Sequence, residues 1–313
     1  MAVYILRRIA GMVVVMFVVA TIVFLISHVI PGDPAAVMLG PTATAADIAA
    51  LRSRLGLDAP LPVQYVQFLH SVIQLRLGES IFLGRSVTTA LAERAPLTLQ
   101  LTVLAAGLAT LIGVPIGILS AVKRGGATDQ ILTALAMAGA SLPSFWIGLT
   151  LIEYLAVRLH ILPVAGYGPP GAGALERLTY LIMPAIALGI PSSALIMRFT
   201  RTSMLDVLQE DYVRTARAKG LRPGQVIFKH AFRNARTSVL TVVGLTVAGL
   251  LGGAIVTETV FALPGVGNLV VSAVLRRDYP VIQGALLVIS GVYVLVNLSI
   301  DVLYAVLDPR VRF

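Results

Sequence analysis

Six long stretches without Asp, Glu, Lys or Arg dominate the chain and limit what it can fold into. A helix needs about 20 apolar residues to cross a hydrocarbon core of about 30 Å. Each stretch has 20 to 28 residues. Because a bilayer offers no partner to free backbone groups, the stretches predict six membrane-spanning helices and not a sheet. They are Ile9–Gly32, Ala95–Val122, Gln130–Ile152, Leu178–Met197, Thr237–Thr257 and Tyr279–Ile300.

Composition supports a membrane protein and excludes several kinds of chemistry. Charged residues are 12% of the 313 residues, about half of the roughly 25% that soluble domains carry. The chain has no cysteine, which excludes disulfides, thiolate metal sites and a cysteine nucleophile. The four histidines lack metal-ligand spacing and no Gly-x-Ser-x-Gly motif occurs, so we expect no catalytic residue and no metal site.

No nucleotide-binding motif accompanies the spans. A phosphate-binding loop needs Gly-Lys-Ser or Gly-Lys-Thr, and none of the three lysines follows a glycine. We therefore expect no enzyme, no bound cofactor and no ATPase site in this chain. The formal net charge of +9 would suggest nucleic acid in a soluble protein, but in a membrane protein it indicates cytoplasmic loops, and we expect no nucleic-acid partner.

The distribution of Lys and Arg predicts the orientation. With the N-terminus in the cytoplasm, 15 basic and six acidic residues lie inside, against nine basic and nine acidic residues outside. The positive-inside rule favours this arrangement, which puts both termini in the cytoplasm. We expect the first stretch to be a retained span, because a signal-peptide core has only about 7 to 15 residues.

Two connections are too long to be simple turns. The outer one, between residues 31 and 94, alternates Pro and Gly with short amphipathic pieces at Asp47–Leu55 and Val63–Leu75, so we expect it to fold, either as a cap or as a docking surface. The inner one, residues 198–236, contains a short helical stretch that Gly220 and Pro223 close. Its small residues Ala216, Ala218 and Gly220 suit close contact with a groove of another protein, and a solvated interfacial helix is the alternative.

The inner connection closely resembles the cytoplasmic loop of dipeptide and oligopeptide ABC-importer permeases. The resemblance begins with Tyr212–Leu221 and continues with Lys229–Ala235. Further segments resemble the B-type permease of that family in order and spacing along almost the whole chain. They are Pro31–Pro34, Pro143–Trp146, Glu258–Gly267, Arg277–Pro280 and Asp308–Arg310.

The resemblance implies an all-α polytopic protein with six transmembrane helices, the type I ABC importer permease fold, in the bacterial cytoplasmic (inner) membrane. It implies an N-terminal region, residues 1–94, with one span and the outer loop, and a five-helix core, residues 95–313. The implied partners are a homologous second permease in a heterodimer, two ABC ATPase subunits that use ATP and Mg, an extracytoplasmic substrate-binding protein and membrane lipid. Peptides are the implied cargo, moved by alternating access, with nickel chelates, glutathione, haem or another small solute as alternatives.

The same resemblance assigns an ATPase-coupling helix to the inner connection. Small residues at Gly113–Gly117 and Ala248–Gly252 are expected to allow the close packing of spans that a movement between two states needs, and ordinary packing without movement is the alternative. The coupling residues are Asp211, Tyr212, Arg214, Thr215, Ala216, Arg217, Ala218, Lys219, Gly220 and Leu221.

Five residues are candidates for a translocation pathway: Ser144, Phe145, Trp146, Glu153 and Glu258. Glu153 stands in an apolar run, and a carboxylate at the bilayer centre costs about 2.5 to 3.5 kcal/mol. Arg158 is five residues away, whereas an α-helical pair needs three or four. We therefore expect Glu153 to find its partner in a second permease or in the substrate, or to reach water at the membrane surface.

An ion-coupled secondary transporter is the distant alternative function. Such a protein is expected to bury ionisable residues at the middle of its spans, and these spans are nearly bare of them. Uptake that depends on ATP, against uptake that depends on an ion gradient, separates the two classes.

Overall fold

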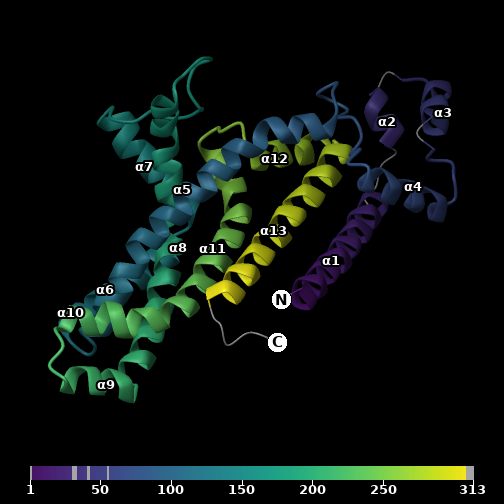
Figure 1. Cartoon of the computed structure of the whole chain (residues 1–313). Helices are drawn as coiled ribbons and strands as arrows, with labels where there is room; N and C mark the ends of the chain where they lie inside the picture. Colours follow the sequence, from purple (N-terminus) through teal and green to yellow (C-terminus); the bar gives the residue numbers. More distant parts are fainter. Residues whose placement is uncertain (1, 30–33, 41–42, 55, 308–313) are drawn as a thin grey trace. The chain divides into compact units, whose positions relative to one another are not determined.

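The computed structural model describes residues 2–29, 34–40, 43–54 and 56–307, and all of its long elements are helices (Figure 1). This confirms the predicted all-α class. The elements are α1 (Ala2–Val29), α2 (Pro34–Leu39), α3 (Ala45–Arg54), α4 (Leu61–Ile73), α5 (Val87–Val122), α6 (Ala127–Ser141), α7 (Ser144–Leu151), η1 (Ile152–Arg158), α8 (Ala174–Leu208), α9 (Asp211–Ala218), α10 (Pro223–Gln225), η2 (Val226–Phe232), α11 (Arg233–Val260), α12 (Val266–Arg276) and α13 (Tyr279–Leu307).

Among the described residues, five helical stretches are long and apolar enough to cross a membrane, and a bent pair makes a sixth if it counts as one span. The bent pair, α6 with α7 and η1, covers the third predicted span, which we expected to be one continuous helix. It turns by 93° between Ser141 and Ser144. Pro143 lacks an N–H and disfavours helical backbone in the residue before it, and Leu142 is accordingly extended, with φ −83° and ψ 125°.

The described chain divides into two compact units. One combines Leu97–Gly267 with the last turns of α13 from Leu295, and the other combines Ala2–Pro96 with Asn268–Val294. The sequence-based division into residues 1–94 and 95–313 stays a prediction. The motif segments at 31–33 and 308–310 lie outside the described residues.

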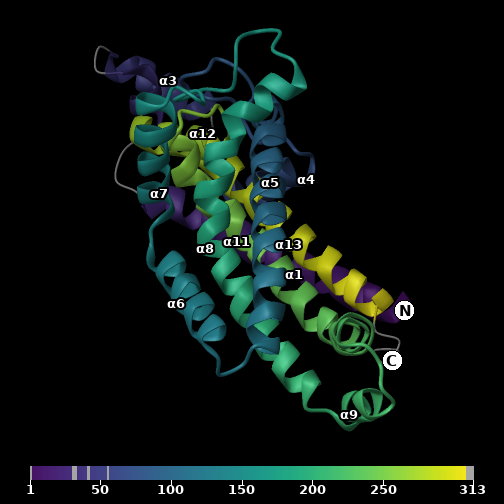
Figure 2. The same cartoon turned by 90° about the vertical axis from the view of Figure 1, so that its left-hand side faces the viewer.

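In the first unit α8 is the central helix, and α6, α7 and α11 pack along it (Figure 1 and Figure 2). α9 lies at one end of this unit, and α7 lies toward the opposite end. The apolar core of the α7 end includes Leu101, Met183 and Phe261, which are almost fully buried.

Glycines set how closely α5 approaches α8. A methyl group on Gly113 would lie 2.7 Å from the backbone oxygen of Ser193, and one on Gly117 would lie 2.6 Å from that of Met197. The close packing expected at Gly113–Gly117 is therefore present. At Ala248–Gly252 it is absent for the glycines, since Gly249 and Gly252 face open space.

The second unit contains the folded connection between the first two spans. α3 and α4 form where the amphipathic pieces predicted them, and α4 packs on α1 through Phe68, Leu69 and Val72. The buried Asp278 carboxylate accepts a hydrogen bond of 2.5 Å from the Ser80 hydroxyl, which fixes the loop before α5 to the start of α13.

A capping box begins α3. The Asp47 amide donates to the Thr44 hydroxyl, and the Thr44 amide and hydroxyl donate to the Asp47 carboxylate. These hydrogen bonds, chiefly that from the hydroxyl, hold the pKa of Asp47 below its ordinary value.

Two segments, η1 and η2, have π-helical geometry, in which each N–H bonds to the carbonyl five residues earlier. η1 closes the bent pair, and η2 leads from α9 into α11. Apolar periodicity does not distinguish such a segment from an α-helix, and neither segment was predicted.

Candidate functional site

α9 is a short amphipathic helix that rests on its own chain. Val213 and Ala216, three residues apart, are 0% and 5% exposed. They pack against Val226 of η2 and against Val207 and Leu208 in the last turn of α8. The spacing of three puts both residues on one helical face, so α9 is fixed to the end of the central helix.

Gly220 ends α9 in a left-handed conformation, with φ +76°. The Gly220 amide donates to the Arg217 carbonyl at 2.9 Å, and the Leu221 amide donates to the Ala216 carbonyl at 3.4 Å. This pair of bonds is a Schellman motif, which favours glycine at this position. The glycine therefore turns the chain from α9 toward α10.

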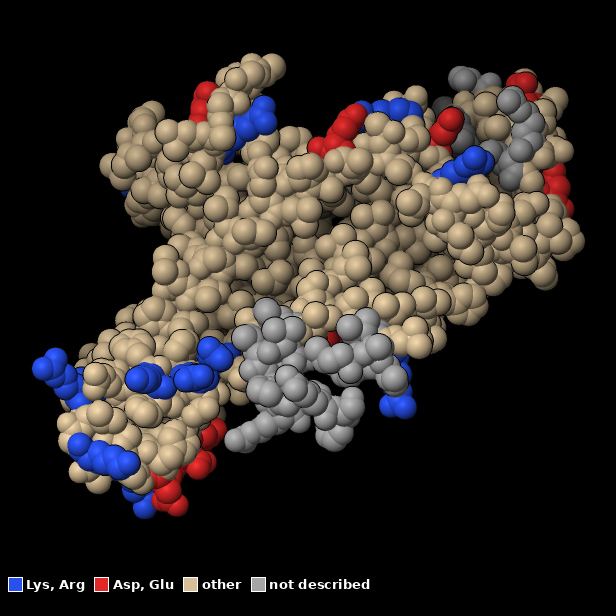
Figure 3. Space-filling model, viewed as in Figure 1, with Lys and Arg blue, Asp and Glu red and all other residues tan. Residues whose placement is uncertain are grey.

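The remaining face of α9 is exposed. Asp211 and Arg214 are 92% and 72% exposed and form an ion pair of 3.5 Å. Figure 3 shows Lys and Arg gathered at this end of the unit, over α9, α10 and η2. The exposed basic residues of these elements and their connections are Arg214, Arg217, Lys219, Arg222 and Lys229.

The buried face changes the interpretation of the small residues. Ala216 was expected to lie in a groove of another protein, but it packs within its own chain. Ala218 and Gly220 are exposed and available to a partner. Tyr212 is 41% exposed, and its hydroxyl accepts a hydrogen bond of 2.7 Å from the side-chain NH₂ group of Asn234 at the start of α11.

An ion pair between the buried Asp129 and the partly buried Arg201 joins helices of the first unit. The Asp129 carboxylate of α6 accepts two hydrogen bonds of 2.8 Å from Nε and Nη2 of Arg201 on α8. It also accepts a bond from the Ser120 hydroxyl at 2.5 Å and one from the Gly125 amide at 3.0 Å. One carboxylate therefore joins α5, the turn after it, α6 and α8.

Comparison with known proteins assigns this architecture to a family. The family described as "Binding-protein-dependent transport system inner membrane component" matches residues 113–313, and the N-terminal membrane component of such systems matches residues 1–102. The chain belongs to this family of permeases. It is the membrane component of a binding-protein-dependent ABC transporter and not its ATPase subunit, and its family implies ATPase and binding-protein partners.

Relatives match the permease over its whole length. The "Probable peptide ABC transporter permease protein y4tP" of Sinorhizobium fredii is 45% identical over 313 residues, which are 100% of both chains. The "Glutathione transport system permease protein GsiC" of Pectobacterium atrosepticum is 44% identical over 310 residues, 99% of each chain.

A solved structure confirms the fold. Inward-facing MetNI, a methionine ABC transporter, contains a chain that matches with a TM-score of 0.60 and 18% identity, over 70% of the permease and 96% of that chain. The permease is therefore a multi-pass inner-membrane protein with the type I importer fold, as expected.

The predicted pathway residues lie in three separate places. Phe145 and Trp146, 46% and 50% exposed, follow the bend in the third span, and Ser144 beside them is half-buried. Glu258 lies at the end of α11 and is 0% exposed. Its carboxylate accepts a hydrogen bond of 2.6 Å from the Thr98 hydroxyl of α5, so it lines no open space here.

Glu153 has a partner within the chain, contrary to expectation. The Arg158 Nε donates to its carboxylate at 2.8 Å, and both side chains are exposed. The spacing of five is poor in an α-helix, but η1 is π-helical, and its wider turn brings residues five apart together. Arg158 also stacks over the Tyr154 ring at 4.9 Å.

The sequence interpretation missed the Asp129–Arg201 pair. The available signal was an acid one residue before the third charge-free stretch and a basic residue shortly after the fourth. Ionisable residues at the ends of spans commonly reach water, so only the tertiary structure distinguishes a buried pair from two surface charges.

Proposed function

We propose that this permease is a subunit of an importer for di- or oligopeptides. The observation that carries this is the 45% identity, over all 313 residues, to a relative named as a probable peptide permease. Glutathione is the second candidate substrate, supported by the 44% identity to a glutathione permease. Both kinds of substrate carry amide bonds and free carboxylates.

The proposed assembly has a homologous second permease beside this chain, two ABC ATPases at the α9 end and a substrate-binding protein at the opposite end. ATP and Mg bind to the ATPases. The excess of basic residues over α9, α10 and η2 supports a cytoplasmic position for that end, with both termini cytoplasmic. The folded connection with α3 and α4, within the proposed N-terminal region of residues 1–94, then lies outside, where it offers a surface to the binding protein.

In this proposal α9 is the coupling helix. Its exposed residues, among them Thr215 and Ala218, and the Lys219 that follows it contact an ATPase. Val213 and Ala216 transmit the movement to α8 and η2. The Asp129–Arg201 pair passes it from α8 to α6. Alternating access then follows when the ATPases close.

The pathway proposal keeps Ser144, Phe145, Trp146 and Glu153. They share the bent third span, in which the exposed aromatic rings directly follow a rigid proline bend. Glu258 belongs to the same proposal only in a conformation that opens its contact with Thr98.

Reconstituted transport tests the substrate. The complete transporter in liposomes is supplied with labelled dipeptide, labelled oligopeptide or labelled glutathione, each with its binding protein. We expect ATP-dependent uptake of the peptides and none with an ATPase subunit that cannot hydrolyse ATP. Uptake of glutathione alone selects the second candidate, and uptake driven by an ion gradient without ATP contradicts the importer class.

A pair of tryptophan substitutions tests the coupling helix. Ala218→Trp adds bulk to the exposed face, so we expect normal folding and loss of ATP-driven uptake. Ala216→Trp overpacks the buried face and is expected to lower stability by about 1 to 3 kcal/mol as well. Ala218→Ser is the matched control with full uptake. Full uptake by well-expressed Ala218→Trp contradicts the ATPase contact.

Single-thiol labelling tests the orientation, because the chain has no cysteine of its own. A membrane-impermeant maleimide on intact cells is expected to label Ala59→Cys, in the connection between α3 and α4, and to leave Arg222→Cys unlabelled. The reverse pattern contradicts the orientation.

A further inference from the structure

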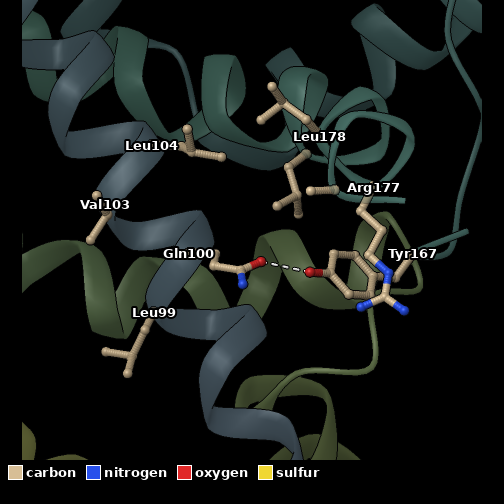
Figure 4. A pocket seen from close by; sticks show the side chains of 9 residues that line it. Leu99, Gln100, Val103, Leu104, Tyr167, Arg177 and Leu178 are labelled. Atoms are coloured by element: carbon tan, nitrogen blue, oxygen red, sulfur yellow. Dashed lines mark hydrogen bonds between the residues drawn. The ribbon is translucent and has the colours of Figure 1, made fainter. Parts of the chain in front are cut away.

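A cavity of about 590 Å³, drawn in Figure 4, opens on the first unit beside the start of α8, whereas α9 follows the other end of that helix. This volume lies within the range of about 300 to 1,000 Å³ that is usual for small-molecule sites. Residues 99–104 of α5 form one wall, and the first turns of α8 form another. Most of the lining is apolar: Leu99, Val103, Leu104, Ala174, Leu178 and Leu181.

Three polar side chains meet on one side of the cavity. The Tyr167 hydroxyl donates to the Gln100 side-chain oxygen at 2.6 Å, which leaves the Gln100 NH₂ group to face other partners. The Arg177 guanidinium carbon lies 5.3 Å from the centre of the Tyr167 ring. Figure 4 shows the tyrosine ring between the glutamine and the arginine.

The loop before α8 is built to hold Tyr167 in this position. Gly166 and Gly168 on either side of it both have φ +89°, a conformation that side-chain-bearing residues rarely adopt. The Gly166 amide donates to the Phe261 carbonyl at 2.9 Å, which fixes the loop to the end of α11. The tyrosine is therefore a fixed wall of the cavity.

Arg177 is a cation without a compensating anion among the described residues. Its Nε is buried without a hydrogen-bond partner there, whereas Arg158 and Arg201 each pair with a carboxylate. Arg177 also lies in the first turns of α8, where the helix dipole favours anions and disfavours cations. An anion in the cavity would satisfy the guanidinium, the Gln100 amide and this end of the helix together.

We propose that this cavity binds a carboxylate that carries an apolar side chain, namely the C-terminal residue of a transported peptide. Arg177 and the Gln100 amide donate to the carboxylate, and the leucines and Val103 hold the side chain. An anionic phospholipid also combines an anion with apolar chains, but its anion is a phosphate, and the neutral Gln100 and Tyr167 groups suit the peptide amide that adjoins a C-terminal carboxylate. The inference rests on the proposed peptide transport and adds the place and the chemical group that are recognised.

Thiol protection tests binding directly. Leu178→Cys places the only thiol of the chain in the cavity, and the complete transporter in lipid nanodiscs is treated with N-ethylmaleimide. We expect labelling that the dipeptide Leu-Leu slows at least fivefold and that its C-terminal amide does not slow. Arg177→Gln in the same background is expected to remove the protection, and Ala59→Cys reports labelling outside the cavity.

Other labelling results overturn the inference. Equal protection by Leu-Leu and by its C-terminal amide would show that the cavity does not recognise the carboxylate. Labelling that depends on phosphatidylglycerol in the nanodisc and not on peptide assigns the cavity to lipid. A thiol that never reacts means that lipid tails or the second permease cover the cavity.

Uptake separates this inference from the proposed function. With Leu-Leu, Arg177→Gln is expected to lower ATP-driven uptake about tenfold, which corresponds to the loss of one charged hydrogen-bonding group. Arg177→Lys keeps the positive charge and is expected to retain some of the uptake. Full uptake by Arg177→Gln overturns the cavity site and leaves peptide import standing, whereas no uptake by the unaltered protein contradicts peptide import itself.

Discussion

Two buried carboxylates, Asp129 and Glu258, hold the first unit together in different ways. Asp129, 4% exposed, accepts a two-pronged contact from Arg201, 72 positions along the chain. Glu258, 0% exposed, accepts from the neutral Thr98 hydroxyl and lies against Gly265, in the turn before α12, and Gly267, in its first turn. At the first site a long cationic side chain reaches the acid, and at the second the backbone itself approaches it.

This difference determines which kind of substitution destabilises each site most. An ion pair depends on the charge of both partners, because removing one leaves the other without compensation. A site closed by glycines depends on the absence of side chains, because any added atom must displace the carboxyl group. Stability is therefore expected to depend strongly on charge-removing substitutions at Asp129 and on substitutions that add atoms beside Glu258.

Removing the Asp129 carboxylate is expected to have the largest effect. Asp129→Ala leaves the Arg201 cation without its partner and is expected to destabilise the permease by about 3 to 5 kcal/mol. The measurement is the thermal unfolding midpoint of the purified complex in detergent. Asp129→Ala combined with Arg201→Ala is expected to be more stable than Asp129→Ala alone, and strictly additive effects would contradict the pairing.

Adding one methyl group beside the Glu258 carboxylate is expected to have the second-largest effect on stability. A methyl group on Gly265 would collide with the Glu258 carboxyl group, so Gly265→Ala is expected to cost about 2 to 3 kcal/mol. Gly252→Ala is the matched control, since that glycine faces open space within α11 and alanine favours helix. Equal unfolding midpoints for the two variants would contradict the enclosure of Glu258.

Removing the Thr98 hydroxyl is expected to lower stability by a smaller amount. This hydroxyl donates to Glu258 and accepts from the Val266 amide at 2.9 Å, so Thr98→Val leaves both groups without it. We expect a loss of about 1.5 to 2 kcal/mol in the same unfolding experiment. Thr98→Ser keeps the hydroxyl and is expected to lose less than about 1 kcal/mol, so similar losses in both variants would assign the role to the methyl group.

Neutralising the exposed Glu153 carboxylate is expected to have the smallest effect on stability. Glu153 pairs with Arg158 at 2.8 Å, but both side chains are about half exposed or more, and such pairs contribute little in water. Glu153→Gln is expected to change stability by less than about 0.5 kcal/mol. A larger loss in the unfolding midpoint would mean that a partner subunit buries this pair.

Local chemistry made the helices and their class predictable from the sequence. Charge-free stretches report apolar surroundings directly, and Gly220 and Pro223 indicated the end of the short helix before the structure placed it at Ala218. The inward position of Ala216 was not predictable, because it depends on Val226 and on the end of α8, which only folding brings together.

The candidate sites were predicted less completely for the same reason. Glu258 was selected from a motif, but its burial depends on Thr98, 160 positions away in the chain. Arg177 stands one residue before the fourth charge-free stretch, and nothing in the sequence places it beside Tyr167, which in turn bonds to Gln100. These sites depend on contacts between segments far apart in the sequence, and the residue pattern within one segment does not predict such contacts.

The π-helical segment η2 has a consequence for how the chain tolerates changes of length. A π turn contains one residue more than the α turn it replaces, while the helix on either side continues in nearly its original direction. Deleting one residue between Val226 and Phe232 is therefore expected to convert η2 to ordinary helix, with α9 and α11 still joined. The same deletion inside α11, at Gly244 against Ile300, rotates every following side chain by about 100° and removes its packing. Single-residue gaps between related permeases are accordingly compatible with the fold at η2 and disruptive a few turns later.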